Sequence, residues 1–135
     1  MEPLFTWSGR IVRGNQLGRT IGFPTANLIP GDDFPPGIRH GVYAVRASVS
    51  GLLYDGMANI GIRPTIGDKI LTVEVNLFDF SADIYGEFIV IWFYDFLRPE
   101  KKFSGLEELK SQIRKDQVRV KMLLAMRPKP DPDSQ

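Results

Sequence analysis

The hydrophobic period of this sequence changes once, near residue 98, and this change restricts the folds that the chain can adopt. Up to about residue 96, short runs with strand-like patterns alternate with clusters of turn residues. After Arg98, apolar residues recur at steps of three or four positions, or multiples of them, which predicts an amphipathic helix running to about Ala125. A series of strands followed by one helix predicts a small antiparallel barrel with the helix packed outside. Because strands and helices do not alternate, a Rossmann-like or P-loop architecture is disfavoured.

Alternation of side chains assigns the faces of the predicted strands. Residues 41–50 alternate well, so that every second side chain from Tyr43 onward faces one side. Ser50 with Gly51 predicts a tight turn and therefore a hairpin. Residues 87–96 are apolar on both faces, which predicts a central strand. Further strands are predicted at 5–13, 52–61 and 70–80, and loops at 14–25, 30–41, 63–69 and 83–86.

The predicted helix also sets the expected domain boundary. Ser104 followed three residues later by Glu107 is typical of a capping box at the start of a helix. Asp116 lies inside the pattern at a point where the helix could be interrupted. We expect one domain over residues 1–126 and a disordered tail over residues 127–135, which are rich in proline and charge.

Composition and charge exclude several classes of protein. The chain of 135 residues has room for one core, and its net charge of +1 gives no reason to expect general affinity for nucleic acid or anionic membranes. The absence of cysteine removes disulfides, zinc–thiolate sites and cysteine nucleophiles. The N-terminus lacks the pattern of a signal peptide, and no apolar run approaches the ~20 residues needed to span a bilayer. We therefore expect a single-domain cytoplasmic protein without a membrane partner.

The stretch from Gly18 to Asn27, GRTIGFPTAN, admits two interpretations of about equal weight. One is a wide hairpin loop in which several glycines adopt positive φ. The other is a phosphate-binding loop, in which glycines let backbone amides approach phosphate oxygens and Arg19 adds positive charge. If the run is extended, Thr25 and Asn27 point the same way and offer neutral oxygens. Such oxygens suit Mg²⁺ when phosphates carry the negative charge.

Glu74 and the segment 97–103 also admit two interpretations each. Glu74 lies between Val73 and Val75 and faces away from both. Most such residues face solvent, but a lone carboxylate beside a cleft could accept a proton from a hydroxyl during phosphoryl transfer to an alcohol. The segment 97–103, LRPEKKF, is either a charged surface loop or a loop that closes over a planar ligand. In the second case Arg98 would stack on the ligand or donate hydrogen bonds to it.

A set of motifs occurs in a fixed order between Trp7 and Met122. The motifs are GRIVRG, GRTIGFPTAN, NIGIRPT, VEVNLFDF with DIYG, LRPEKKF, and EEL with QIxxD. No single motif is specific, but the ordered set is, and it covers nearly the whole chain. By this set the chain resembles the riboflavin kinase, or flavokinase, family.

The resemblance implies a fold and an activity. The fold would be mainly β, a six-stranded antiparallel barrel of Greek-key type with the C-terminal α-helix packed outside. The activity would be transfer of the γ-phosphoryl group of ATP to the ribityl 5′-hydroxyl of riboflavin, giving FMN and ADP. Mg²⁺ would accompany ATP as the cofactor.

The motifs also carry the family's residue roles over to this sequence. Glu74 matches the strand glutamate that acts as the catalytic base. Thr25 and Asn27 match the residues that contact Mg²⁺ and the phosphates. Arg98 and Lys101 match the loop that closes on the flavin. The residues implied to bind the nucleotide are Gly14, Gly18, Arg19, Gly22 and Thr25.

Many bacterial members of the family form one half of a bifunctional FAD synthetase. The resemblance therefore implies an adenylyltransferase module as a partner in a full-length protein. This chain has one histidine and no length for that module, so it is not expected to make FAD itself. The alternative function is a non-catalytic small β-barrel that binds nucleic acid or a protein partner. The near-neutral charge and the lack of a Lys/Arg stripe count against it, and no nucleic-acid partner is expected.

Overall fold

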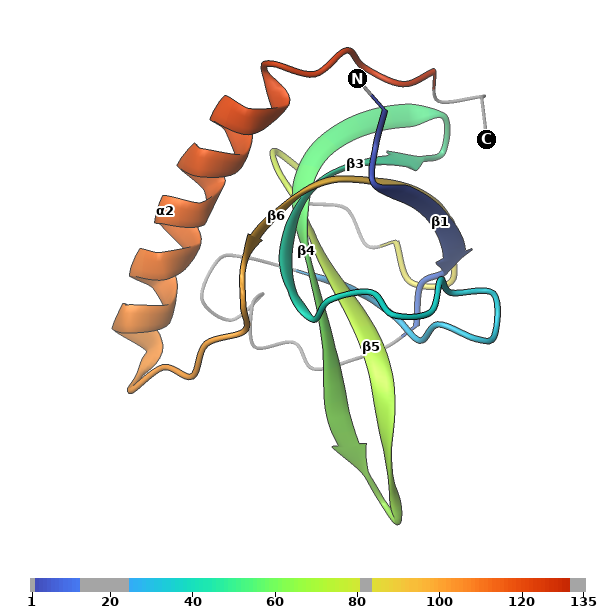
Figure 1. The fold of residues 1–135 in the computed structure, drawn as a ribbon, viewed down its shortest axis with the longest axis vertical. Coiled ribbons are helices and arrows are strands. Elements are labelled where there is room, and N and C mark those ends of the chain that lie inside the picture. Colours follow the sequence, from blue (N-terminus) through green and yellow to red (C-terminus); the bar gives the residue numbers. More distant parts are fainter. Residues whose placement is uncertain (1, 13–24, 81–83, 132–135) are drawn as a thin grey trace.

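The structure, a computed structural model, describes residues 2–12, 25–80 and 84–131 of the chain. In this part of the chain, six strands form one antiparallel sheet, and one α-helix packs on the outer face of the sheet (Figure 1). The strands are β1 (Phe5–Arg10), β2 (Ala26–Leu28), β3 (Gly41–Val49), β4 (Leu52–Thr65), β5 (Asp68–Leu77) and β6 (Phe88–Arg98), and the helix is α2 (Leu106–Leu124).

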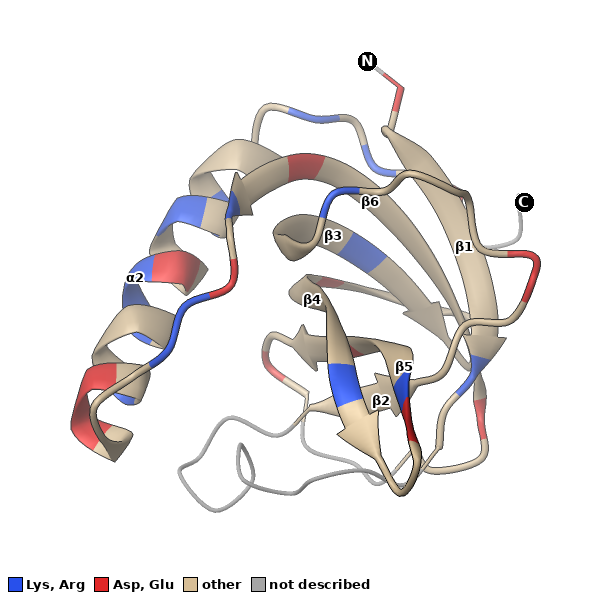
Figure 2. Cartoon of the chain, turned by 60° about the horizontal axis from the view of Figure 1, so that its bottom comes forward, with Lys and Arg blue, Asp and Glu red and all other residues tan. Residues whose placement is uncertain are grey.

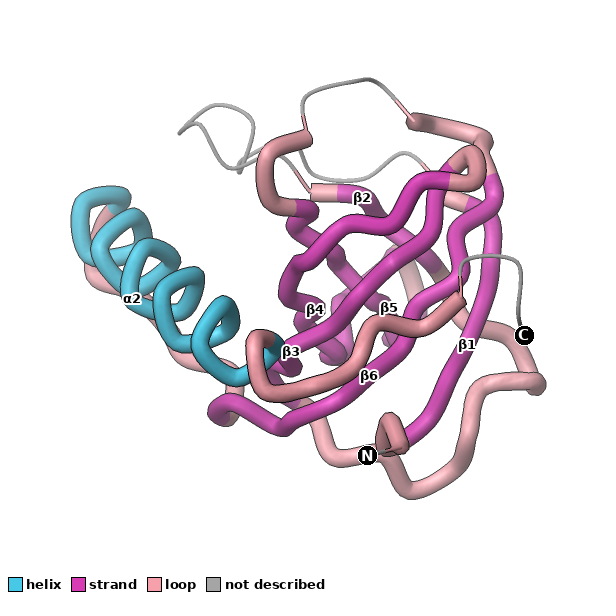
Figure 3. The backbone as a smooth tube through the Cα atoms, turned by 90° about the horizontal axis from the view of Figure 1, so that it is seen from above, coloured by secondary structure: helices cyan, strands magenta, loops and turns pink. Residues whose placement is uncertain are grey.

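The strand order across the sheet is β1-β6-β3-β4-β5-β2. Strands β3, β4 and β5 are consecutive neighbours, and β6 returns to lie beside β3, which is a Greek-key connection. The sheet curls into a half-barrel (Figure 3). The amide of Val12, just after β1, donates to the carbonyl of Asn27 in β2 at 2.7 Å, so the two edges approach each other. The expected six-stranded antiparallel fold with an external C-terminal helix is confirmed.

Two apolar clusters lie on opposite faces of the sheet. The inner cluster fills the inside of the curl, and the outer cluster lies between the sheet and α2. Strand β6 contributes to both, because Ile91 and Phe93 are buried in the inner cluster whereas Trp92 and Tyr94 are buried in the outer one. The two apolar faces of this strand are thereby explained. Its expected central position is confirmed, since β6 pairs with β1 on one side and β3 on the other.

The turn predicted at Ser50 and Gly51 is confirmed, because both residues have positive φ, 52° and 79°, as two-residue hairpin turns require. The segment from 29 to 40 contains no strand, as expected. Strand β1 ends at Arg10, three residues before the predicted end. No helix in the described ranges is both long and apolar enough to cross a membrane.

The hairpin of β4 and β5 is longer than the sequence predicts. Residues 63–69, expected to form a loop, instead continue both strands, and only Ile66 and Gly67 form the turn. Gly67 has a φ of 82°, which glycine adopts at no steric cost. Pro64 favoured the loop prediction, because proline lacks the amide donor that a central strand needs. Pro64 is accommodated because the pairing of β4 with β3 ends at Ile60. No carbonyl of β3 therefore needs a donor at position 64.

Helix α2 begins one residue later than a capping box at Ser104 requires. Its N-cap is Gly105, which has an extended backbone with φ of −177°, and no side chain in the described ranges caps the first amides. Ser104 instead donates its hydroxyl hydrogen to Glu108 Oε2 at 2.8 Å. The capping-box prediction for Ser104 and Glu107 is therefore wrong, since the box needs the serine itself at the N-cap. The helix also runs without interruption through Asp116.

The chain remains packed on the sheet just after α2. Arg46 of β3 donates to the carbonyls of Leu124, Arg127 and Pro128 at 2.6, 3.1 and 2.9 Å. The packed part of the chain therefore extends at least two residues beyond the expected boundary at residue 126. The division into a domain and a disordered tail stays a prediction, and residues 132–135 lie outside the described ranges.

Candidate active site

Three polar side chains form a row across the outer face of neighbouring strands. Asn27 in β2 lies directly opposite Glu74 in β5, and Glu74 lies directly opposite Asn59 in β4. Opposed residues of antiparallel strands point to the same face, with Cβ atoms about 5 Å apart. Val42 lies opposite Asn59 on the other side and belongs to the outer cluster beneath α2, so the row lies on the outer face. Asn27, Glu74 and Asn59 are called the polar row below.

Strand alternation places these side chains on that face. Val73 and Val75 flank Glu74 and are buried in the inner cluster, as are the two neighbours of Asn27. The orientation that the sequence predicts for Glu74, away from both valines, is confirmed. Its side chain is 28% exposed, so the carboxylate is accessible to a bound molecule.

Arg63 of β4 links Glu74 to a second carboxylate, that of Glu100. Arg63 Nε lies 3.4 Å from Glu74 Oε1, and Arg63 Nη1 donates to Glu100 Oε2 at 3.1 Å. Asn59 Nδ2 donates to the same Glu100 oxygen at 3.1 Å. The segment after β6 is thereby bonded to the polar row. Positive and negative positions lie close together on the β4–β5 hairpin (Figure 2).

Sequence reasoning did not identify Arg63 and Glu100 as members of this site. Both belong to motifs of the ordered set, but nothing in the sequence joins positions that are 37 residues apart. Gly61 is the one signal that could have suggested it. A Cβ added there would lie 2.5 Å from Glu100 Oε1, so the missing side chain leaves space for that carboxylate.

Arg98, at the end of β6, is bound to helix α2. Its Nη2 and Nε donate to Asp116 Oδ2 at 2.8 and 3.1 Å, and its Nη1 donates to the carbonyl of Pro99 at 3.0 Å. Gln112 Nε2 donates to Asp116 Oδ1 at 2.9 Å. The side chain of Asp116 is 4% exposed, so this pair is a buried anchor for the start of the segment 99–105.

Lys101, the other residue implied to bind flavin, lies in the same segment. It is exposed, and its Nζ lies 5.6 Å from the ring centre of Phe103, a cation–π distance. Arg98 is therefore fixed at the root of the segment, and Lys101 lies farther along it at the surface. Glu100 lies between them and contacts Asn59 of the polar row.

Thr25 and Asn27 are the residues implied to hold Mg²⁺. Thr25 is half-buried directly before β2, two positions from Asn27. Within the described ranges, no group of three or more His, Cys, Asp or Glu side chains forms a metal cluster. Mg²⁺ commonly takes only one or two protein ligands and completes its shell with water and substrate phosphates. The hydroxyl and amide oxygens at these two positions fit that chemistry.

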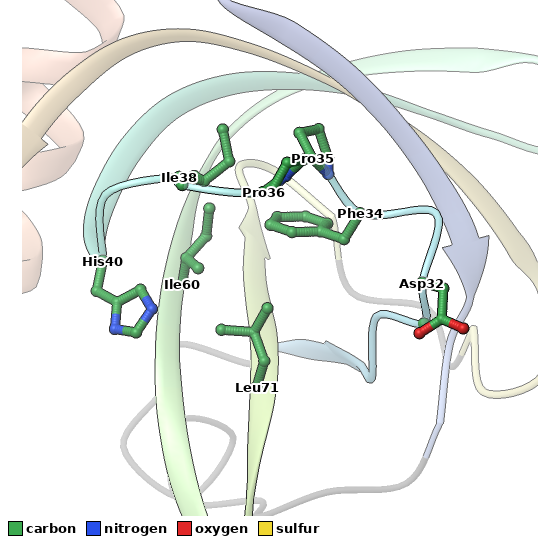
Figure 4. A pocket seen from close by; sticks show the side chains of 10 residues that line it. Asp32, Phe34, Pro35, Pro36, Ile38, His40, Ile60 and Leu71 are labelled. Atoms are coloured by element: carbon green, nitrogen blue, oxygen red, sulfur yellow. The ribbon is translucent and has the colours of Figure 1, made fainter.

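A separate pocket of about 230 Å³ lies beneath the loop that joins β2 to β3 (Figure 4). Ile60 of β4 and Leu71 of β5 line it, and both pack in the inner cluster. The pocket therefore lies on the opposite face of these strands from the polar row. His40, the one histidine of the sequence, also lines it. Sequence reasoning treated this loop only as irregular and did not foresee the pocket.

The comparison with known proteins decides the family. The family model described as riboflavin kinase, or Flavokinase, matches residues 2–124. The chain belongs to the riboflavin kinase family. The bifunctional riboflavin kinase/FMN adenylyltransferase of Bacillus subtilis strain 168 is 46% identical over 120 residues, which are 85% of this chain and 37% of that protein. The RNA-binding riboflavin kinase RibR of the same strain is 46% identical over 110 residues, 81% of this chain and 46% of that protein.

Comparison with solved structures also shows the fold of a riboflavin kinase. The riboflavin kinase of Trypanosoma brucei has a TM-score of 0.67 and 27% identity, and the match covers 94% of this chain and 83% of that one. A Streptococcus pneumoniae structure titled as a macrolide-efflux protein has a TM-score of 0.78 and 38% identity, covering 88% of this chain and 38% of that one. The chain spans less than half the length of the two curated relatives.

Membership of the riboflavin kinase family confirms the resemblance that the ordered motifs indicate. The roles of single residues stay predictions. Of the residues implied to bind the nucleotide, only Thr25 is described by the structure. The other four, Gly14, Gly18, Arg19 and Gly22, lie outside the described ranges.

Proposed function

We propose that this chain is a riboflavin kinase that transfers the γ-phosphoryl group of ATP to the ribityl 5′-hydroxyl of riboflavin, giving FMN and ADP. Family membership supports the substrates. The observation that carries the chemistry is the position of Glu74. Its accessible carboxylate lies in one row with Asn27 and beside the segment that Arg98 anchors. These positions support a base next to a metal-and-phosphate side and a flavin side.

Glu74 acts on the acceptor hydroxyl. Its carboxylate accepts a hydrogen bond from the ribityl 5′-hydroxyl, orients it toward the γ-phosphorus and takes its proton as the new P–O bond forms. Transition states of phosphoryl transfer are loose in most analyses, so orientation contributes more than basicity. A rigid position on a paired strand, between β4 and β2, suits this role.

Thr25 and Asn27 bind the metal–nucleotide side. Their neutral oxygens would hold Mg²⁺, which when bound supplies positive charge against the phosphoryl oxygens. Gly14, Gly18, Arg19 and Gly22 would cover the nucleotide with backbone amides and a guanidinium.

Arg98 and Lys101 bind the flavin side. The hydrogen bonds from Arg98 to Asp116 and Pro99 support different roles for Arg98, just before the segment 99–105, and for Lys101 within it. Arg98 fixes the direction in which the segment leaves β6, and its remaining N–H groups would be available to the flavin. Lys101, exposed farther along, contacts the flavin when the segment covers it.

The adenylyltransferase half of the bifunctional relatives supports a proposal about context. In a longer protein, this chain would supply FMN to such a module, and we propose that the chain acts in the cytoplasm. It is not proposed to make FAD.

One assay tests the proposed function directly. The chain is incubated with riboflavin, ATP and Mg²⁺, and FMN and ADP are separated by chromatography. We expect equal amounts of the two products, and none when ATP is omitted or Mg²⁺ is chelated. Absence of FMN from a folded sample that binds riboflavin would overturn the proposal.

A further inference from the structure

Arg63 lies between two carboxylates, and this arrangement gives it a specific task. Its Nε lies 3.4 Å from Glu74 Oε1, and its Nη1 donates to Glu100 Oε2 at 3.1 Å. We propose that Arg63 is a positioning residue for Glu74 and that Glu100, in the segment after β6, fixes the orientation of Arg63. The inference rests on the proposed function, because it concerns the same base.

The register of β4 and β5 explains how Arg63 reaches Glu74. Asn59 is opposite Glu74, Gly61 is opposite Thr72, and Arg63 is opposite Ile70. Residues 59, 61 and 63 share one face of β4 by alternation. Glycine at the middle position places no side chain between Arg63 and the polar row, and Arg63 Nε reaches Glu74. The carboxylate of Glu100 occupies the same space above Gly61.

Glu100 determines the direction of the Arg63 guanidinium. Arg63 Nη1 donates both to Glu100 Oε2 and to the carbonyl of Ile62, each at 3.1 Å. A guanidinium is planar and rigid, so fixing Nη1 also fixes where Nε points, which is toward Glu74. Asn59 strengthens the arrangement, because its Nδ2 donates to the same Glu100 oxygen.

The side-chain amide of Asn59 is oriented by its hydrogen bond to Glu100. A carboxylate only accepts hydrogen bonds, so the NH₂ group of Asn59 must face Glu100. Asn59 Oδ1 is consequently buried without a hydrogen-bond partner in the described part of the chain. Glu100 thereby fixes Asn59 as well as Arg63.

An ordinary surface ion pair is the alternative, and it makes different predictions. The side chains of Arg63 and Glu74 are 36% and 28% exposed, and pairs this exposed add little to stability. If the ion pair between Arg63 and Glu74 is only an ordinary surface pair, removing Arg63 changes neither stability nor turnover. If Arg63 positions the base, stability is nearly unchanged while kcat falls, because the hydroxyl and carboxylate lose their alignment.

The test uses single variants of the full chain in the FMN-forming assay. Arg63→Ala is expected to lower kcat roughly 10- to 100-fold, with KM for riboflavin and ATP and the urea unfolding midpoint unchanged. Arg63→Lys keeps the charge without the fork and should recover only part of the loss. Lys69→Ala removes an exposed cation from the same hairpin and is the matched control, with wild-type kcat expected.

Gly61→Ala tests the contribution of Glu100 without changing any charge. The added methyl meets the Glu100 carboxylate and displaces it, so kcat should fall as it does in Glu100→Ala. The double variant Gly61→Ala/Glu100→Ala should have a kcat no lower than that of either single variant, because both substitutions remove the same contact. Glu107→Ala, at a side chain 89% exposed, is the carboxylate control.

The outcomes separate this inference from the proposed function. The inference alone is overturned if the wild-type chain forms FMN and Arg63→Ala keeps an unchanged kcat. A loss of kcat in Arg63→Ala that only equals the loss in Lys69→Ala overturns it too. If the losses of kcat in Gly61→Ala and Glu100→Ala add fully in the double variant, the part of the inference assigned to Glu100 is overturned. Failure of the wild-type chain to form FMN overturns the proposed function instead.

Discussion

At the scale of single residues, Asn27 and Glu74 form the pair on which the proposed chemistry depends. They lie directly opposite each other on β2 and β5, so a metal–phosphate group bound at Asn27 is within reach of the Glu74 carboxylate. A neutral amide suits the position opposite the proposed base. A second carboxylate so close would repel the first and favour protonation of one of them.

Asn27→Ala and Thr25→Ala are each expected to raise the Mg²⁺ concentration needed for half-maximal FMN formation, because each removes one neutral oxygen ligand. The measurement is a Mg²⁺ titration at saturating riboflavin and ATP. Thr72→Ala is the matched control, since the Thr72 hydroxyl is bonded to the carbonyl of Gly61 within the hairpin. An unchanged Mg²⁺ requirement in both test variants would contradict the assigned roles.

The direction in which single side chains point could be predicted from the sequence, but their partners could not. The orientation of Glu74 depends only on alternation along one strand. The pairing of Arg63 with Glu100 and of Arg98 with Asp116 depends on which elements become neighbours, over separations of 37 and 18 residues. One sequence without relatives carries no signal for such contacts beyond the occasional glycine.

At the scale of elements, helix α2 packs on β3, β4 and β6, and two arginines attach it. Arg98 binds Asp116 in the second half of the helix, and Arg46 binds the carbonyls at its C-terminal end. Arg46 is 2% exposed, and its Nε also donates to Asp55 Oδ1 at 3.1 Å. A cation at this end complements the helix dipole and satisfies carbonyls that have no partner within the helix.

Arg46→Ala is expected to lower the free energy of unfolding by about 3 kcal/mol, because the buried carbonyl of Leu124 and the carboxylate of Asp55 lose their donor. The measurement is urea denaturation followed by circular dichroism. Arg10→Ala removes an exposed arginine that donates to the carbonyl of Gly86, and should change stability by less than about 0.5 kcal/mol. A comparable loss in both variants would show that Arg46 is not a specific anchor.

Element types followed from the sequence more closely than element ends. The change of period separated the strands from α2, yet the N-cap of the helix shifted from Ser104 to Gly105 and the strands of the hairpin extended through Pro64. Local residue preferences decide ends only weakly, and pairing between β4 and β5 decided the ends of the hairpin strands.

At the scale of the whole molecule, each apolar cluster buries a tyrosine. Tyr43 lies in the inner cluster and Tyr94 in the outer one. Burial raises the pKa of both phenols above the ordinary value of 10.0, and the nearby guanidinium groups of Arg39 and Arg46 oppose this shift without cancelling it. The folded state therefore retains these protons to higher pH than the unfolded state does.

The free energy of unfolding should consequently be unaffected by these phenols below about pH 10 and decrease as the pH rises beyond it, because only the unfolded state then releases the protons readily. The measurement is urea denaturation at several values between about pH 8 and about pH 11. Tyr43→Phe should make the decrease shallower, although it also loses the hydrogen bond from the Tyr43 hydroxyl to the carbonyl of Arg39. An equally steep decrease in that variant would contradict the burial argument for Tyr43.

The whole fold was predictable because it depends on the pattern of the entire chain rather than on one position. Short strands with turn residues, one terminal helix and one strand apolar on both faces together specify an antiparallel sheet covered by that helix. The absence of nucleic-acid binding rests on the net charge of +1 and stays a prediction. One relative carries RNA binding in its name, and that description applies to the relative.

The central claim is that Glu74 orients and deprotonates the ribityl hydroxyl, and turnover of Glu74→Gln tests it most directly. The amide keeps the shape of the side chain but cannot take the proton. We predict that kcat for FMN formation falls about 10²- to 10⁴-fold, while riboflavin and ATP still bind and Glu107→Gln remains fully active. Near-normal turnover in Glu74→Gln would contradict the account.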